Sequence, residues 1–189
     1  MNTPAHLIFG AAAFGKPGAQ RVTGAALAGS LLPDVSLFVL VGWSILINGT
    51  DAHAVFRQSY FSDSWQRVFA IDNSFLLWGI LLGIALWRRG PALIAFAASG
   101  MMHLGFDFVL HNEDARMQFW PLSDWRFRSP FSYWDQNLHA GVVGPLELGG
   151  SLLLCAVLIA RYRSLPARML FVFLGVSEVL TSDIWGIIH

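Results

Sequence analysis

The residues best suited to chemistry are two histidines and an aspartate spaced four apart: His103, Asp107 and His111. They lie at the end of an apolar run that begins at Pro91. A spacing of four is slightly more than one helical turn, so the three side chains fall along one face of a helix. Ionisable groups on an apolar helix are costly to bury, so they need partners or a metal ion. The spacing therefore indicates either a stripe that hydrogen-bonds to a neighbouring helix or a metal site.

The composition of the chain is typical of an integral membrane protein. Of its 189 residues, 55% are hydrophobic and only 13% are charged, whereas charged residues make up about 25% of an average soluble domain. The formal net charge is zero, and no basic patch points to nucleic acid. Cys155 is the only cysteine and lies in an apolar run, so we expect it to pack in the core. We expect one membrane domain over residues 1–189.

Apolar runs predict an all-α, polytopic membrane helical bundle with about five spans and a short N-terminal helical hairpin. The hairpin pairs residues 5–14, which are too few to span a bilayer, with residues 22–32. It would bring His6 back towards Asp34. The remaining apolar segments are 35–47, 74–87 (or 68–87), 91–110, 141–160 and 169–188.

Two local motifs carry structural predictions. The sequence Leu32-Pro33-Asp34 is expected to interrupt the helix, because proline lacks a backbone donor and disfavours helix just before it. Asp34 then serves as the N-cap of the next helix, as part of an ion site, or as both. The spacing Gly79-x-x-x-Gly83 predicts close packing against another helix.

The charges between the spans predict the orientation. The short turns carry basic residues and no acids, whereas the two long loops, 48–73 and 111–140, hold five arginines and seven acids. The positive-inside rule therefore places the short turns in the cytoplasm and the long loops outside it. The basic residues of the short turns are Lys16, Arg21, Arg88, Arg89, Arg161, Arg163 and Arg168. The loop 111–140 is rich in Trp, Tyr and Phe, so we expect it to lie on the membrane surface and to contact membrane lipid.

The number of residues between each basic turn and the ionisable group of its span, multiplied by the helical rise per residue, places these groups at a common depth in the membrane. Measured from the nearest basic turn, each group lies about 20 to 24 Å along its helix. Asp107 comes slightly higher, at about 27 Å. Scattered structural carboxylates would have no reason to share a level, so the count predicts one site in the outer half of the membrane. The groups at this level are Asp34, Asp72, His103, Glu147 and Asp183.

Four short motifs, in order, resemble the YdjM-type membrane-bound metal-dependent hydrolases, which are distantly similar to zinc-dependent phospholipase C. The motifs are Thr3-Pro4-Ala5-His6, Gly29-Ser30-Leu31-Leu32-Pro33-Asp34, His103-x-x-x-Asp107 and Trp120-Pro121-Leu122. The resemblance covers roughly residues 1–150 and implies a multi-helix membrane fold with metal-dependent hydrolase activity. It implies His6, Asp34, His103 and Asp107 as metal ligands. We expect the chain in a bacterial inner membrane.

The chain departs from this family at one place. The family carries a His-Arg…Thr-His-Ser motif before the His-x-x-x-Asp, but the corresponding residues 66–74 contain no histidine. Either Asp72 or Asn73 takes over a ligand position, or the site has lost its metal or its activity.

The candidate residues suit hydrolysis at a divalent metal. Imidazole and carboxylate donors favour Zn²⁺, with Mn²⁺ or Fe²⁺ as alternatives. Asp72 or Glu147 would take the proton of a metal-bound water, and His139 is a further ligand, an acid for the leaving group, or a solvated loop residue. Arg126 and Arg128 bind a phosphate headgroup or extend to the membrane interface. With Asp183, the same carboxylates would orient the imidazoles.

The substrate class expected from this chemistry is a lipid-like molecule or a phosphoester at the outer leaflet. The alternative is a protein without catalytic activity. The buried acids would then form a proton or cation path in a small transporter. A structural subunit that docks a partner through the aromatic loop 111–140 is the remaining option.

Overall fold

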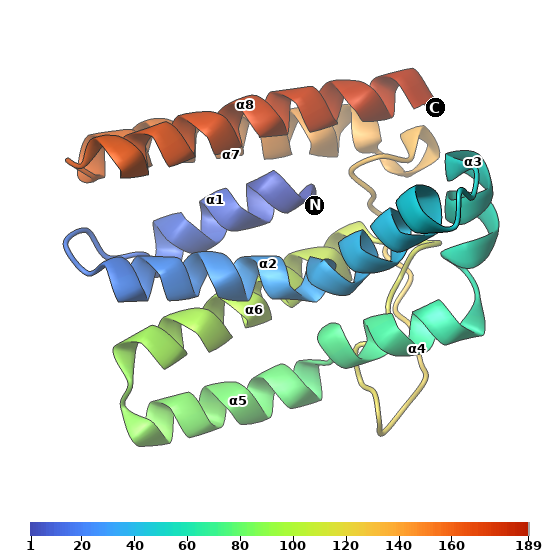
Figure 1. The fold of residues 1–189 in the computed structure, drawn as a ribbon, viewed down its shortest axis with the longest axis horizontal. Helices are drawn as coiled ribbons and strands as arrows, with labels where there is room; N and C mark the ends of the chain where they lie inside the picture. The colour runs from blue at the N-terminus through green and yellow to red at the C-terminus, as the bar shows by residue number, and fades with distance from the viewer. Residues whose placement is uncertain (189) are drawn as a thin grey trace.

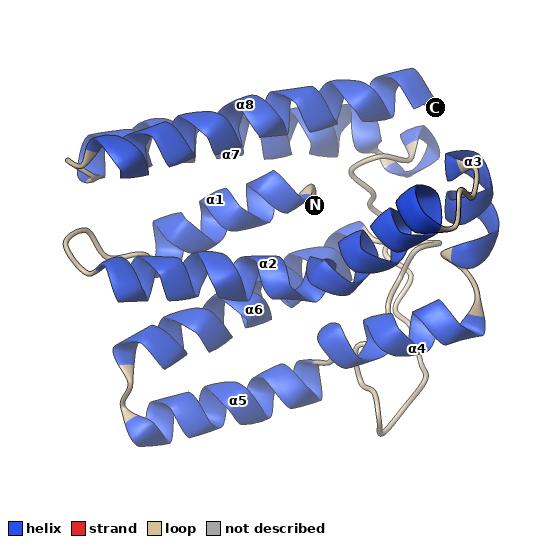
Figure 2. Cartoon of the chain, viewed as in Figure 1, coloured by secondary structure: helices blue, strands red, loops and turns tan. Residues whose placement is uncertain are grey.

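The computed structural model describes residues 1–188, with side chains described through Ser182. Every regular element in this part of the chain is a helix (Figure 2). The long helices are α1 (Thr3–Phe14), α2 (Gln20–Gly42), α4 (Asp63–Asp72), α5 (Phe75–Arg88), α6 (Pro91–Leu110), α7 (Ala140–Arg161) and α8 (Leu165–Ile188). The short ones are α3 (Ala52–Ala54), the π-helical turns Trp43–Ile47 and Val55–Ser59, and the 3₁₀ turn Gln136–Leu138.

Five helical segments are long and apolar enough to cross a membrane. They cover Gln20–Ile47, Asp63–Arg88, Pro91–Leu110, Ala140–Arg161 and Leu165–Ser182. Many large apolar side chains of these segments are exposed, as is typical of helices that face lipid. The predicted fold class, an all-α membrane helical bundle with five spans, is confirmed.

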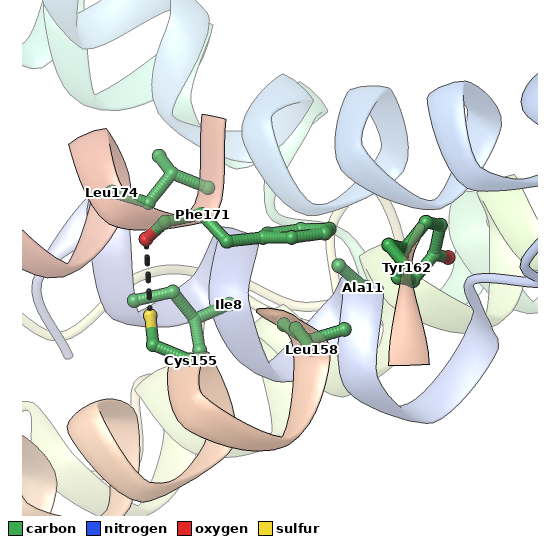
Figure 3. Close-up of a cluster of buried hydrophobic side chains, with 7 residues drawn as sticks. All are labelled: Ile8, Ala11, Cys155, Leu158, Tyr162, Phe171 and Leu174. Atoms are coloured by element: carbon green, nitrogen blue, oxygen red, sulfur yellow. Dashed lines mark hydrogen bonds between the residues drawn. The ribbon is translucent and has the colours of Figure 1, made fainter. Parts of the chain in front are cut away.

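Helix α1 lies inside the bundle and contacts four of the spanning helices, α2, α6, α7 and α8 (Figure 1). Its residues Ile8 and Ala11 have no exposed surface. They pack with Cys155 and Leu158 of α7 and Phe171 of α8 in the main apolar cluster (Figure 3). Because this core surrounds a helix too short to span the membrane, the start of α1 is held at an interior position of the bundle.

The predicted break at Pro33 was wrong. Helix α2 runs without interruption from Gln20 to Gly42, with Pro33 inside it. Proline leaves the carbonyl four residues earlier without its helical donor, and spanning helices accommodate this where the surrounding protein adjusts. At this position the side-chain amide of Asn73 also donates to the carbonyl of Pro33 itself, at 3.2 Å. Asp34 is consequently an interior helical residue and not an N-cap, and residues 22–32 belong to the first span.

The close helix contacts occur at glycines other than the predicted pair. A Cβ atom added at Gly29 would lie 2.0 Å from the backbone oxygen of Phe96, and one at Gly100 would lie 2.1 Å from the Trp78 ring. No atom lies within 4 Å of such a Cβ at Gly79 or Gly83, so the packing predicted for that motif is absent among the described residues. Gly29 instead permits the close approach of α2 and α6.

The predicted loop 48–73 is partly helical. Residues 63–72 form α4, which leads into α5 after a short break at Asn73 and Ser74. Ser74 caps α5 by accepting a hydrogen bond from the backbone N–H of Leu77 at 3.2 Å. The α1–α2, α5–α6 and α7–α8 turns, which carry the basic residues, lie together at one end of the bundle (Figure 1).

Candidate metal centre

Helix α6 provides the stripe expected from the spacing of four. His103, Asp107 and His111 are all buried, and each histidine points its Nε2 atom at the same carboxylate. His103 Nε2 lies 3.1 Å from Asp107 Oδ2, and His111 Nε2 lies 3.1 Å from Asp107 Oδ1. Asp107 is therefore the centre of the stripe.

Helix α1 adds His6 to this centre. Its Nε2 lies 2.9 Å from Asp107 Oδ1, and its ring stacks on His103 with centroids 3.5 Å apart and planes at 11°. The Met1 amino group also lies 3.1 Å from Asp107 Oδ1. Donor atoms of His6, His103 and Asp107 all lie within 4.8 Å of one another, so this His-His-Asp group could hold a metal ion.

Helix α2 brings Asp34 to the edge of the group. Its Oδ1 lies 3.6 Å from His103 Nε2, and its Oδ2 accepts a hydrogen bond from the Thr3 hydroxyl. The juxtaposition of Asp34 with His103 agrees with their equal calculated depth. Three of the four residues predicted as ligands thus form the His-His-Asp group, and Asp34 lies beside it against His103.

The hydrogen bonds of His103 fit a metal ligand. Its Nδ1 lies 2.7 Å from the Ser30 backbone oxygen, which can only accept, so Nδ1 carries the proton. In the neutral ring, Nε2 then presents a lone pair to the carboxylates of Asp34 and Asp107. Two stacked imidazolium rings would repel each other, so the arrangement accommodates one protonated ring or a bound cation, but not protonation of both His6 and His103. A carbonyl that fixes the tautomer of a ligating histidine is usual at metal sites.

The loop 111–140 folds against this centre. The Asp114 carboxylate lies 2.7 Å from His111 Nδ1 and accepts a hydrogen bond from the Trp134 indole at 3.3 Å. Burial alone would lower the pKa of His111, but the carboxylates of Asp114 and Asp107 outweigh it and raise that pKa to about 9. Burial would likewise raise the pKa of Asp114, but His111 holds it at about 2. His111 and Asp114 therefore form a charged pair at neutral pH.

The other predicted site residues are spread around the centre. Glu147 is buried on α7 and accepts a hydrogen bond from the Asn2 backbone N–H at 2.6 Å. Asp72 is half-buried at the end of α4, and Arg126 is half-buried in a surface groove beside α4. Arg128 and His139 are exposed, and the His139 ring contacts Phe131. The side chain of Asp183 lies outside the described residues. The roles predicted for these residues stay predictions.

Two groups of buried polar residues were not among the predicted site residues. Glu178 of α8 is fully buried and accepts from the Asn2 side chain at 3.3 Å, so that Asn2 joins it to Glu147. Arg116 and Gln118 are buried in the loop 111–140. The position of Glu178 in an apolar span is the sequence signal that could have indicated a buried role. Arg116 and Gln118 lie in an irregular segment, where no periodicity shows which side chains point inward.

Comparison with known proteins found no match among family models, curated proteins or solved structures. The resemblance to YdjM-type hydrolases consequently stays a prediction based on the four short motifs.

Proposed function

We propose that the chain is a membrane-embedded, metal-dependent hydrolase of the YdjM type, with Zn²⁺ held by His6, Asp34, His103 and Asp107. The observation that carries this proposal is the convergence of two imidazole Nε2 atoms on the Asp107 carboxylate inside an apolar bundle. Two nitrogen and two oxygen donors suit zinc, and Mn²⁺ or Fe²⁺ could use the same set.

The chemistry assigned to the site is hydrolysis of a lipid-like or phosphoester substrate at the outer leaflet. A divalent metal with an open position lowers the pKa of a bound water towards about 7. The residues of the chain have separate tasks in this scheme. The Ser30 carbonyl orients His103, Glu147 or Asp72 takes a proton, and the aromatic loop 111–140 limits the access of bulk water.

The test is metal-dependent hydrolysis by the purified full chain in lipid nanodiscs. A panel of phospholipids and chromogenic phosphoesters is assayed with added Zn²⁺ and with a chelator. We expect hydrolysis that requires the metal and is lost in His103→Ala. The matched control is His53→Ala, which removes an exposed histidine that is not part of the centre. Hydrolysis that persists unchanged in His103→Ala would refute the proposed site.

A second candidate function rests on the buried acids of α7 and α8. Glu147 and Glu178 are joined through Asn2 in the interior of the bundle, and carboxylates in such positions often form proton or cation paths. This reading predicts proton-coupled cation flux into liposomes that Glu178→Gln abolishes. It predicts no stoichiometric transition metal, whereas the hydrolase requires one.

A further inference from the structure

The loop segment 115–118 buries two polar side chains that have atoms without a hydrogen-bond partner. Arg116 is 5% exposed and Gln118 is 1% exposed. Nη1 of Arg116 and both amide atoms of Gln118 have no hydrogen-bond partner among the described residues. No carboxylate of the described residues lies within ion-pair distance of the Arg116 guanidinium. Three buried polar atoms are thus left without partners in one short stretch.

The guanidinium is nevertheless held firmly in place. Its Cζ lies 4.2 Å from the centre of the Phe69 ring and 5.0 Å from that of Tyr60. Burial alone would lower the pKa of Arg116, but Tyr60 and the carboxylates of Asp114, Asp107 and Asp34 raise it. A fixed, permanently charged donor with a free N–H is a typical anion-binding group.

Arg116 and Gln118 face the interior and not the surface. Met117 lines the groove beside α4, together with Trp120 and Arg126. Arg116 and Gln118 do not line that groove, and both side chains are buried. They therefore lie beneath the loop and not on its surface.

Each end of the segment contacts residues that neighbour the metal centre. At its start, Asp114 binds His111, whose other nitrogen contacts Asp107. At its end, the Gln118 backbone oxygen accepts from the N–H of Phe75, at the α4–α5 junction. In that junction, Asn73 binds the carbonyl of Pro33, next to Asp34. Ion-pair contacts thus lead from the start of the segment to Asp107, and hydrogen bonds lead from its end to Phe75 and, at the same junction, from Asn73 to the residue before Asp34.

We propose that Arg116 and Gln118 form an anion subsite that binds the phosphate group of the substrate beside the metal centre. Arg116 supplies positive charge and the free Nη1–H, and the Gln118 amide supplies a neutral N–H donor. Unpaired buried donors are costly, so the retention of the Arg116 and Gln118 N–H groups is explained if a bound anion accepts hydrogen bonds from them. This deepens the proposed function and rests on it for the role of the subsite in hydrolysis, while anion binding itself needs no metal.

The test measures binding of two probes to the purified chain in a neutral detergent containing a chelator. The probes are inorganic phosphate and a short-chain phosphatidic acid, and thermal unfolding is followed across a concentration series. We expect at least one probe to stabilise the protein, and Arg116→Met to weaken its apparent affinity at least about tenfold. Arg57→Met, which removes an exposed arginine, should bind like the wild type. Stabilisation by phosphatidic acid alone would identify the anion as a lipid headgroup.

Gln118→Leu separates ligand binding from a structural role. If the amide serves the ligand, its removal leaves the probe-free protein as stable as the wild type, or more stable, and weakens the binding of the probe. A structural role predicts the opposite: lower stability and unchanged affinity. The proposal is overturned if neither probe stabilises the wild type, or if both variants bind as well as it does. Failure to bind metal with intact anion binding would refute the hydrolase and leave the subsite standing.

Discussion

Gly29→Ala tests whether the close approach of α2 and α6 builds the centre. The added Cβ would lie 2.0 Å from the Phe96 backbone oxygen and 2.5 Å from Ser99 Oγ. The hydroxyl can rotate away, but the backbone oxygen cannot. Since ordinary contacts begin at about 3.4 Å, the two helices would have to separate locally by about 1.4 Å.

This separation acts directly on the metal centre. Ser30, the next residue, holds His103 Nδ1 at 2.7 Å through its carbonyl. An added separation of that size would lengthen the contact to about 4 Å, beyond hydrogen-bond range. The tautomer and orientation of His103 would no longer be fixed, and loss of such an outer contact typically costs about 10- to 100-fold in metal affinity. Overpacking should also destabilise the fold by about 1 to 3 kcal/mol, against about 1 kcal/mol gained in helix propensity.

The assay combines zinc titration with thermal unfolding of the chain in detergent. Gly24→Ala is the matched control, because it lies on the same helix and its added Cβ meets no atom within 4 Å. We expect the control to bind zinc like the wild type and Gly29→Ala to lose both affinity and stability. If the two variants behaved alike, the argument that Gly29 positions His103 would be refuted.

Three further predictions concern the loops. Asp114→Asn should lower the unfolding free energy by about 2 kcal/mol at pH 7, because the pKa of Asp114 is held at about 2 by His111. The contribution is complete above the unfolded pKa of about 4 and is lost as the pH falls towards 2, so a difference that stayed constant down to pH 2 would contradict the ion pair. A cysteine introduced at Asp124 should react with an impermeant reagent added outside the cell, while one at Gly90 should not, and the reverse pattern would invert the orientation. Backbone amides of 111–140 should exchange hydrogen slowly in nanodiscs, and rapid exchange throughout would show that this loop does not cover the centre.

Helical geometry was sufficient to predict how the polar side chains of α6 and α2 are arranged. The spacing of His103, Asp107 and His111 defined one face of α6, and the rise per residue placed Asp34 level with His103. Both inferences depend only on the regular geometry of a helix, which an apolar span enforces because every backbone group must be paired internally.

Tertiary context decided the features that could not be predicted. The helix continues through Pro33, and there it packs against Asn73, forty positions away, whose side-chain amide donates to the Pro33 carbonyl. The inward direction of Arg116 and Gln118 depends on the path of an irregular loop fixed by long-range contacts such as that with Phe75. The glycines of α5 have the spacing of a packing motif, but nothing in the spacing indicates that their helix face meets no other described element.

Metal content is the most direct test of the central claim. The full chain, purified after growth with zinc and without chelator, should contain about one transition metal ion per chain by mass spectrometry. His103→Ala and Asp107→Asn should each lose most of it, while His53→Ala, altered at an exposed histidine, should retain it. A wild-type chain without bound metal, or a His103→Ala chain with a full complement, would contradict the account.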